Sequence, residues 1–279
     1  MSGRIVYQGE PGAYSHLACR EHFPNMQPWA CQSFAQAFDR VRRGEADLAM
    51  IPVENTVAGR VSDIYHLLPE GGLHIIAERY QPIHHQLLGL PGTVLSKVTT
   101  ARSHPMALGQ VRNCLTSLGI NALADVDTAA AARKVSERGD PAVVAVASRV
   151  AAEEYGLEVL QADIEDSASN TTRFIVLSRD PDIAVMDDSL FVSSYVFRTR
   201  SVPSALYKAL GGFASNGLNL TKLESYMVGG GFSAVQFYVD VEGHPDSQAM
   251  RNAIEELDFF TEDIRHLGTY PADPVRAGT

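Results

Sequence analysis

The chain has 279 residues, of which 45% are hydrophobic, and this is enough for two domains with sizeable cores. Its formal net charge is -10, so nucleic acid is not an expected partner, and an anionic ligand needs a local positive site. The three cysteines lack metal-binding spacing, no signal-peptide pattern opens the chain, and no apolar run approaches membrane-spanning length. We therefore expect a cytoplasmic protein with no membrane partner.

Strand and helix patterns alternate through roughly the first two-thirds of the chain. Short apolar runs typical of buried strands cover residues 4–8, 47–51, 98–101, 142–146 and 174–177. Helical spacing with capping signals covers residues 13–21, 33–44, 61–68, 105–119 and 128–138. This alternation predicts an α/β fold with parallel sheets. The extended stretch at 73–90 predicts a crossover between two lobes, with a ligand cleft between them.

The order of the elements changes in the last third of the chain. A linker at 179–188 separates an expected domain at 1–183 from a second one at 189–279. In the second domain, strands are expected at 190–197, 218–226, 232–241 and 262–267, and helices at 204–216 and around 250–257. The glycines at 229–231 are expected to join the two middle strands. The order β-α-β-β-α-β predicts a ferredoxin-like sandwich.

A polar cluster stands just ahead of the apolar run that begins at Phe174. It contains Asn170, Thr171, Thr172 and Arg173. The guanidinium of Arg173 is a planar fork that fits a carboxylate or a phosphate, and the two threonines add short donors beside it. The alternative is a polar strand edge that carries a surface arginine.

The loop at 9–15 joins the first strand to the N-terminus of a helix. It contains Gly9, Gly12, Ala13, Tyr14 and Ser15. Backbone N–H groups at such a junction bind anions, so the loop is a candidate substrate site. The alternative is an ordinary tight turn in which glycine supplies the geometry.

Other candidates follow strand ends, where ligands bind in open α/β sheets. Glu54 is a candidate acid or orienting group, while Asn55 either donates to a ligand carboxylate or caps the next helix. His104 stands before a helix and is either a capping residue or a general acid. His84 and His85 alternate sides on an extended run and cannot both face one metal, so no metal site is expected.

Four motifs, at residues 7–15, 51–59, 103–108 and 170–174, resemble those of bacterial prephenate dehydratases with a C-terminal ACT regulatory domain. The resemblance covers nearly the whole chain. It implies a two-lobed catalytic domain like that of a periplasmic binding protein, and a carbon-oxygen lyase that turns prephenate into phenylpyruvate without a cofactor. It also implies that Thr172 assists departure of the ring hydroxyl. Further substrate contacts are implied for Thr56, Gly59, His104, Thr171 and Phe174.

The C-terminal part resembles an ACT domain, except that Tyr226-Met227 replaces the usual Arg-Pro pair. The resemblance implies a homodimer or homotetramer that binds the effector L-phenylalanine near Ser204, Ala205, Leu206, Asn216, Leu218 and Glu224. Free N–H groups at the start of the helix at 204–216 suit the effector carboxylate, and Glu224 suits its ammonium group. Two alternatives stay open, namely a dehydratase that accepts arogenate and a non-enzymatic two-lobed binding or sensor protein.

Overall fold

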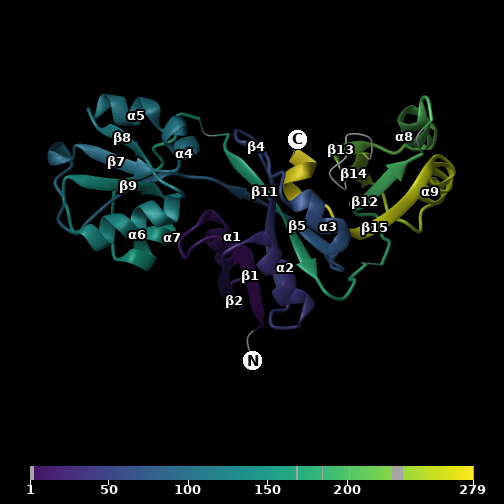
Figure 1. The fold of residues 1–279 in the computed structure, drawn as a ribbon, viewed down its shortest axis with the longest axis horizontal. Helices are drawn as coiled ribbons and strands as arrows, with labels where there is room; N and C mark the ends of the chain where they lie inside the picture. The colour runs from purple at the N-terminus through teal and green to yellow at the C-terminus, as the bar shows by residue number, and fades with distance from the viewer. Residues whose placement is uncertain (1–2, 168, 184, 201, 228–234, 279) are drawn as a thin grey trace. The chain divides into compact units, whose positions relative to one another are not determined.

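The computed structural model describes residues 3–167, 169–183, 185–200, 202–227 and 235–278 (Figure 1). The chain forms two compact units. The first comprises Met1–Ala37, Met50–Val61 and Tyr80–Phe174, and the second comprises Phe38–Ala49, Ser62–Arg79 and Ile175–Thr279. Because these units interleave along the chain, the expected division into residues 1–183 and 189–279 stays a prediction. No helix in the described ranges is both long enough and apolar enough to cross a bilayer.

The first sheet has the strand order β2-β1-β3-β11-β5, with β4 paired to β3. Its strands are β1 (Arg4–Gln8), β2 (Gln27–Cys31), β3 (Leu48–Asn55), β4 (Gly59–Arg60), β5 (His74–Pro82) and β11 (Thr171–Ser178). The helices between them in sequence are α1 (Tyr14–His22), α2 (Phe34–Arg42) and α3 (Ile64–Glu70). Strand β11 returns to this sheet after the chain has built a second one. The end of β3 and the start of β11, which carry two of the candidate motifs, therefore lie on neighbouring strands.

The second sheet has the strand order β10-β6-β9-β7-β8. Its strands are β6 (Gln86–Gly89), β7 (Thr100–Ser103), β8 (Asn121–Ala124), β9 (Val143–Ala147) and β10 (Glu158–Gln161). Its helices are α4 (Pro105–Gln110), α5 (Arg112–Ser117), α6 (Thr128–Arg138) and α7 (Arg149–Tyr155), with a 3₁₀ turn at Leu95–Lys97. Helices α4 and α5 lie on one face of this sheet, and α6 and α7 lie on the other (Figure 1). Side chains alternate across the sheet, so Val144 and Val146 pack with α4 and α5, whereas Ala145 and Ala147 pack with α6 and α7.

The second sheet is mixed, although the sequence predicted parallel pairing. Strand β7 runs parallel to β8 and β9, but β6 is antiparallel to β9 and to β10. The extended stretch expected at 73–90 is the cause. It contains β5 of the first sheet and β6 of the second, so β6 enters its sheet without the crossover helix that makes neighbouring strands parallel. The stretch runs from one sheet to the other, and its role as a crossover between two lobes stays a prediction.

Two helices differ from their predicted extents. The helix expected at 105–119 is broken at Val111, whose backbone angles of φ -122° and ψ 19° are not helical. Both halves still pack on the same core through Leu108 and Leu115, which explains why the apolar spacing resembled that of one helix. The helix expected at 61–68 begins only at Ile64, because the chain first forms the short strand β4.

The third sheet is antiparallel in the pairs observed and has the order β13-β14-β12-β15. Its elements are β12 (Phe191–Thr199), α8 (Ala205–Ser215), β13 (Leu220–Met227), β14 (Val235–Glu242), α9 (Gln248–Phe260), β15 (Thr261–Pro271) and the 3₁₀ turn Pro274–Gly278. This is the predicted ferredoxin-like order, with β15 longer than expected. The predicted connection at 229–231 and the start of the strand predicted at 232–241 lie outside the described residues. Ser204 precedes α8 as expected, but its backbone is left-handed (φ 63°) and its side chain makes no capping bond.

The two faces of the third sheet are covered differently. One face packs its apolar residues, such as Phe197 and Val239, on α8 and α9. The other face carries a buried polar group in which Asp240 accepts hydrogen bonds from Ser194 (2.5 Å) and Tyr238 (2.6 Å). On this side the ring of Tyr65, from α3, packs edge-on against Tyr238 with centroids 5.4 Å apart. The face of the sheet opposite α8 and α9 is therefore also packed within the chain.

A buried ion pair holds the C-terminal segment in the second unit. Glu78 on β5 is fully buried, and Arg276 donates to both of its carboxylate oxygens, at 2.5 and 2.9 Å. The backbone N–H of Asp273 also donates to this carboxylate, at 3.1 Å. Removing one partner leaves a charge in a site that excludes water, which costs far more than the loss of an exposed pair.

We expect Arg276→Ala to lower the free energy of unfolding by about 3–5 kcal/mol, the usual cost of breaking a buried pair from one side. Urea titration followed by circular dichroism measures this change. Arg198→Ala is the matched control, because it removes a pair with Glu262 in which the two side chains are 44% and 46% exposed. The control should cost about 1 kcal/mol or less. Equal effects of the two substitutions would contradict the structural role of Arg276.

Candidate functional site

All four motifs singled out in the sequence contribute residues to one cavity of about 330 Å³ in the first unit. The expected site residues that line this cavity are Gly9, Ala13, Tyr14, Ser15, Asn55, His104, Thr172 and Phe174. The remaining expected residues, which are not part of this lining, are Gly12, Glu54, Thr56, Gly59, Thr171 and Arg173. The contributing residues follow the ends of β1, β3 and β7 or belong to the start of β11, so most of them lie near strand ends.

Asn55 occupies a fixed orientation beside the cavity. Its side-chain oxygen accepts the backbone N–H groups of Val57 (2.9 Å) and Ala58 (2.7 Å), so its amide nitrogen must face the other way. That nitrogen donates to Thr172 Oγ1 at 2.9 Å and to Asn170 Oδ1 at 2.8 Å. Asn55 therefore holds a turn and does not cap the next helix, which starts only at Ile64.

The direction of this bond decides what the Thr172 hydroxyl can do. A hydroxyl has one proton to donate, and Thr172 Oγ1 is already an acceptor from Asn55. Its own proton is then available to a group in the cavity. A hydroxyl that accepts one hydrogen bond is also a stronger donor in the next, particularly where water is scarce. Thr172 can therefore donate a hydrogen bond to a group in the cavity that it lines.

A chain of hydrogen bonds continues from Asn170 around the cavity. Asn170 Nδ2 donates to Gln110 Oε1 (2.9 Å), and the same oxygen lies 2.6 Å from Nε2 of His85. Because that oxygen is an acceptor, the ring proton of His85 is on Nε2. The other ring nitrogen, Nδ1, accepts from the hydroxyl of Tyr14 at 2.6 Å. Burial lowers the pKa of His85, which agrees with a neutral ring, and burial together with Glu165 raises the pKa of Tyr14.

The sequence analysis missed Gln110, His85 and the pair Asp127 and Thr128, all of which line the cavity. Gln110 lies four residues after Met106, so both residues are on the same face of α4. That spacing in the sequence could have identified Gln110 as a candidate site residue. His85 and Asp127 had none, because their roles depend on a crossover segment and a loop whose paths the sequence did not reveal.

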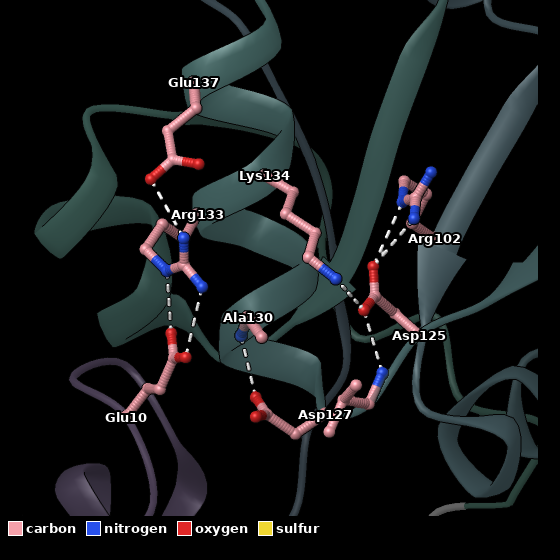
Figure 2. Close-up of polar contacts among 9 residues, drawn as sticks. Glu10, Arg102, Asp125, Asp127, Ala130, Arg133, Lys134 and Glu137 are labelled. Carbon is pink, nitrogen blue, oxygen red and sulfur yellow. Dashed lines mark hydrogen bonds and ion pairs between the residues drawn. The ribbon is translucent and has the colours of Figure 1, made fainter.

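One wall of the cavity is anchored by ion pairs around the start of α6 (Figure 2). Asp127 caps this helix by accepting the N–H of Ala130 at 2.7 Å. Two residues earlier, Asp125 accepts from Arg102 and from Lys134. Burial raises the pKa of Asp125, but the bonds from Lys134, Val126 and Arg102 outweigh that effect and lower it to about 2. The carboxylate therefore stays ionised and fixes the loop that carries Asp127 and Thr128.

The loop at 9–15 is held against the helices of the second sheet. Arg133 on α6 donates to both carboxylate oxygens of Glu10, at 2.9 and 3.2 Å (Figure 2). Gly12 has a φ of +87°, and a Cβ there would lie 2.8 Å from the Cα of Ala151 on α7. Ser148 also donates to the carbonyl of Gly12 at 2.6 Å. Close packing on α7 thus accounts for glycine at position 12.

Arg173 and Glu54 form a pair beside the cavity and not in its lining. Arg173 is only 2% exposed, and its Nη1 donates to Glu54 Oε1 at 3.0 Å. The alternative of a surface arginine is wrong, since the side chain is buried. The expected contact of Arg173 with a substrate carboxylate stays a prediction, and in this structure a carboxylate of the protein occupies part of the guanidinium fork.

Among the described residues that line the cavity, none is an arginine or a lysine. Polar donors come instead from side-chain amides, hydroxyls and the start of α1. The residue before this helix, Ala13, supplies no side-chain cap, and both Tyr14 and Ser15 line the cavity. The N-terminus of a nine-residue helix carries a partial positive charge and favours an anion.

The expected effector residues fall into two groups. Ser204, Ala205 and Leu206 line a separate cavity of about 720 Å³ in the second unit, together with Arg198 and Arg200. The other three, Asn216, Leu218 and Glu224, are not part of this lining. Asn216 follows the opposite end of α8, and Glu224 lies on β13, 3.2 Å from Lys222. The structure thus brings three of the six residues to one site.

A two-lobed α/β unit that surrounds a small cavity with directed donors is typical of an enzyme acting on a small anionic molecule. The family model described as prephenate dehydratase matches residues 5–182. The chain belongs to the prephenate dehydratase family, whose members are lyases.

Relatives and solved structures agree with this membership. A bifunctional N-acyl-homoserine lactone acylase/prephenate dehydratase of Komagataeibacter europaeus is 49% identical over 272 residues, covering 98% of this chain and 97% of the relative. Arogenate dehydratase/prephenate dehydratase 1 of Arabidopsis thaliana is 39% identical over 287 residues, covering 98% and 73%. The crystal structure of prephenate dehydratase from Arthrobacter aurescens in complex with L-Phe is 30% identical, has a TM-score of 0.88 and covers 96% of this chain and 90% of that one.

The neutral state of His85 predicts a pH dependence of stability. The unfolded chain protonates this histidine below about pH 6.5, whereas the folded protein, in which burial lowers its pKa, resists protonation. Stability should therefore rise with pH between about 5 and 7, by at most about 1.4 kcal/mol per pH unit for one group. Burial also lowers the pKa values of His16 and His266, so they add to the slope.

Urea unfolding at several pH values measures the slope. His85→Gln should flatten it relative to the parent protein, while His66→Gln, which removes an exposed ring, should leave it unchanged. An identical slope in the parent protein and in His85→Gln would show that His85 titrates alike in the folded and unfolded states.

Proposed function

We propose that this chain catalyses the decarboxylating dehydration of prephenate to phenylpyruvate, with Thr172 as the donor to the departing hydroxyl. The observation that carries the proposal is the hydrogen bond of 2.9 Å from Asn55 to Thr172, a residue that lines the cavity, because this bond leaves the threonine proton free to be donated to a ligand. In the reaction the bond between the ring and its carboxylate breaks, CO₂ leaves, and the electron pair of that bond enters the ring. These electrons expel the hydroxyl as the ring carbon–oxygen bond breaks and the ring becomes aromatic, and the leaving oxygen takes up a proton from solvent to form water.

A threonine is a weak acid at neutral pH, so its role is that of a hydrogen-bond donor to an oxygen that gains negative charge. Such a donor stabilises the transition state more than the ground state, and this difference is what accelerates a reaction. Aromatisation of the ring supplies a large driving force, so full proton transfer from a strong acid is not required at the transition state. The fixed amide of Asn55 keeps the threonine proton free for this use.

Substrate preference is the open part of this function. Several plant relatives are named arogenate dehydratases, and arogenate differs from prephenate by an amino group in place of a keto group. Asp127 is the acidic residue in the described cavity lining and the candidate partner for that ammonium group. Comparing kcat/KM for the two substrates settles the preference. A purified protein that turns over neither substrate would favour the non-enzymatic binding or sensor alternative.

A second candidate activity comes from the Komagataeibacter relative, whose name includes N-acyl-homoserine lactone acylase. We propose the same cavity as the site to test, because apolar residues such as Ile83, Met106 and Phe174 line it and suit an acyl chain. Release of homoserine lactone, followed by chromatography, measures the activity. Competition between prephenate and the acylated lactone would place both reactions in one cavity.

We expect Thr172→Ala to lower kcat by about 10²–10³ with little change in KM, as for other placed donors. Asn55→Asp should also lower kcat strongly. Its carboxylate cannot donate to Thr172 and would instead accept the threonine proton. Thr172→Ser keeps a hydroxyl and should retain most activity. Spectroscopic assay of phenylpyruvate measures all three variants.

Ser178→Ala is the matched control for the Thr172 series. It removes a hydroxyl from the other end of β11, where the side chain accepts the N–H of Asp180 away from the cavity. Its kcat should equal that of the parent. A folded Thr172→Ala protein with the parent kcat would remove Thr172 from the mechanism.

We infer that L-phenylalanine regulates the enzyme by binding the second unit in a cytoplasmic homodimer or homotetramer. The neighbouring Arthrobacter structure is a complex with L-Phe. In this chain the cavity at the start of α8 offers an uncapped helix N-terminus and the guanidinium groups of Arg198 and Arg200. These groups suit the carboxylate of an amino acid. Regulation of this kind requires a coupling free energy of about 1–3 kcal/mol between the sites.

We expect Ser204→Asp to weaken L-phenylalanine binding measured by calorimetry, because it puts a carboxylate where the ligand carboxylate would bind. Aspartate is a good capping residue, so α8 should remain folded. Ser247→Asp makes the same change at the start of α9 and should leave binding unchanged. Such point variants are preferable to deleting residues 189–279, which would expose Tyr65 and Glu78. Absence of binding to the parent protein would end the regulatory proposal and leave the dehydratase proposal intact.

A further inference from the structure

A second cluster of polar groups lies on the two segments that connect the first sheet with the second. One segment joins β5 to β6 and carries His84, and the other joins β10 to β11 and carries Asp163 and Glu165. The segments run side by side within the first unit. The N–H of Ile164 donates to the carbonyl of His85 at 2.9 Å, and the N–H of Ile83 donates to the carbonyl of Asn170 at 2.8 Å.

Three potential metal ligands converge from these segments. His84 Nδ1 lies 2.7 Å from Glu165 Oε1 and 4.0 Å from Asp163 Oδ1, and the three ligand atoms lie within 4.8 Å of one another. Both carboxylates are oriented by the protein. Glu165 Oε2 accepts the N–H of His85 at 2.9 Å, and Asp163 Oδ1 accepts from Gln86 Nε2 at 3.0 Å. Hydrogen bonds that fix the ligands in this way are a common feature of metal sites.

Two buried glutamines provide an independent sign of a missing ligand. Gln81 and Gln86 are 3% and 2% exposed, and the side-chain oxygen of each has no hydrogen-bond partner. Their orientations are fixed, because the amide nitrogen of Gln81 donates to Glu21 and that of Gln86 donates to Asp163. Both line the cavity of about 520 Å³ that also contains His84 and Asp163. Unpartnered buried acceptors call for a cation or for the water molecules that a cation holds.

We propose that His84, Asp163 and Glu165 bind one divalent transition-metal ion of the Zn²⁺ type, with Gln86 as a supporting oxygen. An imidazole with two carboxylates suits such an ion better than Mg²⁺ or Ca²⁺, which prefer sites made only of oxygen. Two carboxylates balance its charge. Two arginines, Arg20 and Arg149, line the same cavity, and Arg20 is paired with Glu153 at 2.7 Å.

The position of this metal site gives the ion a structural role that is separate from the reaction in the catalytic cavity. An ion bound there joins the two connecting segments and restrains them relative to each other. His84 and His85 point to opposite sides, and His85 belongs to the hydrogen-bond chain of the candidate active site. The metal site is therefore adjacent to the catalytic cavity without sharing a side chain with it. The ion restrains the connection between the lobes and takes no part in the reaction.

Calorimetry on the full chain, stripped with a chelator and titrated with ZnCl₂, tests the proposal. The measurement uses a Cys114→Ser background, because thiolates bind Zn²⁺ and this thiol is only partly buried. One Zn²⁺ should bind per chain and raise the melting temperature. His84→Gln and Asp163→Asn should each weaken binding at least tenfold, and Gln86→Leu should weaken it by about 10–100-fold, as for other supporting groups.

Asp246→Asn is the matched control, since it removes an exposed carboxylate 3.7 Å from His244 where no third ligand is present among the described residues. It should leave Zn²⁺ affinity unchanged, and CaCl₂ should not compete. Failure of the parent protein to bind Zn²⁺ would overturn the proposal. Equal Zn²⁺ affinity in the parent protein and in His84→Gln would also overturn it, and would mean that His84 and Glu165 form only an ion pair.

Discussion

The amide of Asn55 is the constraint on which the candidate site depends. Two backbone N–H groups hold its oxygen, so its nitrogen can only donate, and it donates to Thr172 and Asn170. The orientation of each following side chain in the hydrogen-bond chain depends on that of Asn55. Asn170 must donate to Gln110, and the proton of His85 must lie on Nε2. A single turn at the end of β3 thus sets the direction of a hydrogen-bond chain that reaches Tyr14 on the opposite wall.

The sequence predicted where the motifs would gather better than what each residue would do. Strand ends were readable from apolar runs, and Asn55 and Thr172, each singled out at the end of such a run, form a hydrogen bond in the structure. The partner of Arg173 was not readable, because Glu54 is far away in sequence and on a neighbouring strand. Arginine and glutamate look like surface residues until their pairing is known, and burial of such a pair depends on tertiary structure.

The ferredoxin-like sheet is a second case in which burial could not be predicted from the sequence. One face of β12 and β14 is consistently apolar and packs on α8 and α9. The opposite face carries Ser194, Tyr238 and Asp240, whose residue types are commonly exposed. These polar groups satisfy one another, and Tyr65 of α3 packs against them. A polar face becomes buried when its members are mutual donors and acceptors, and the sequence pattern does not record that pairing.

The absence of arginine and lysine from the described cavity lining has a chemical rationale for this reaction. Loss of CO₂ removes the negative charge of the ring carboxylate as the reaction proceeds. A full cation paired with that carboxylate would stabilise the ground state more than the transition state and would slow the step. Neutral donors and the start of α1 bind an anion while stabilising this ground state less than a full cation would. Beside the cavity, the carboxylate of Glu54 pairs with Arg173 and partly neutralises its positive charge.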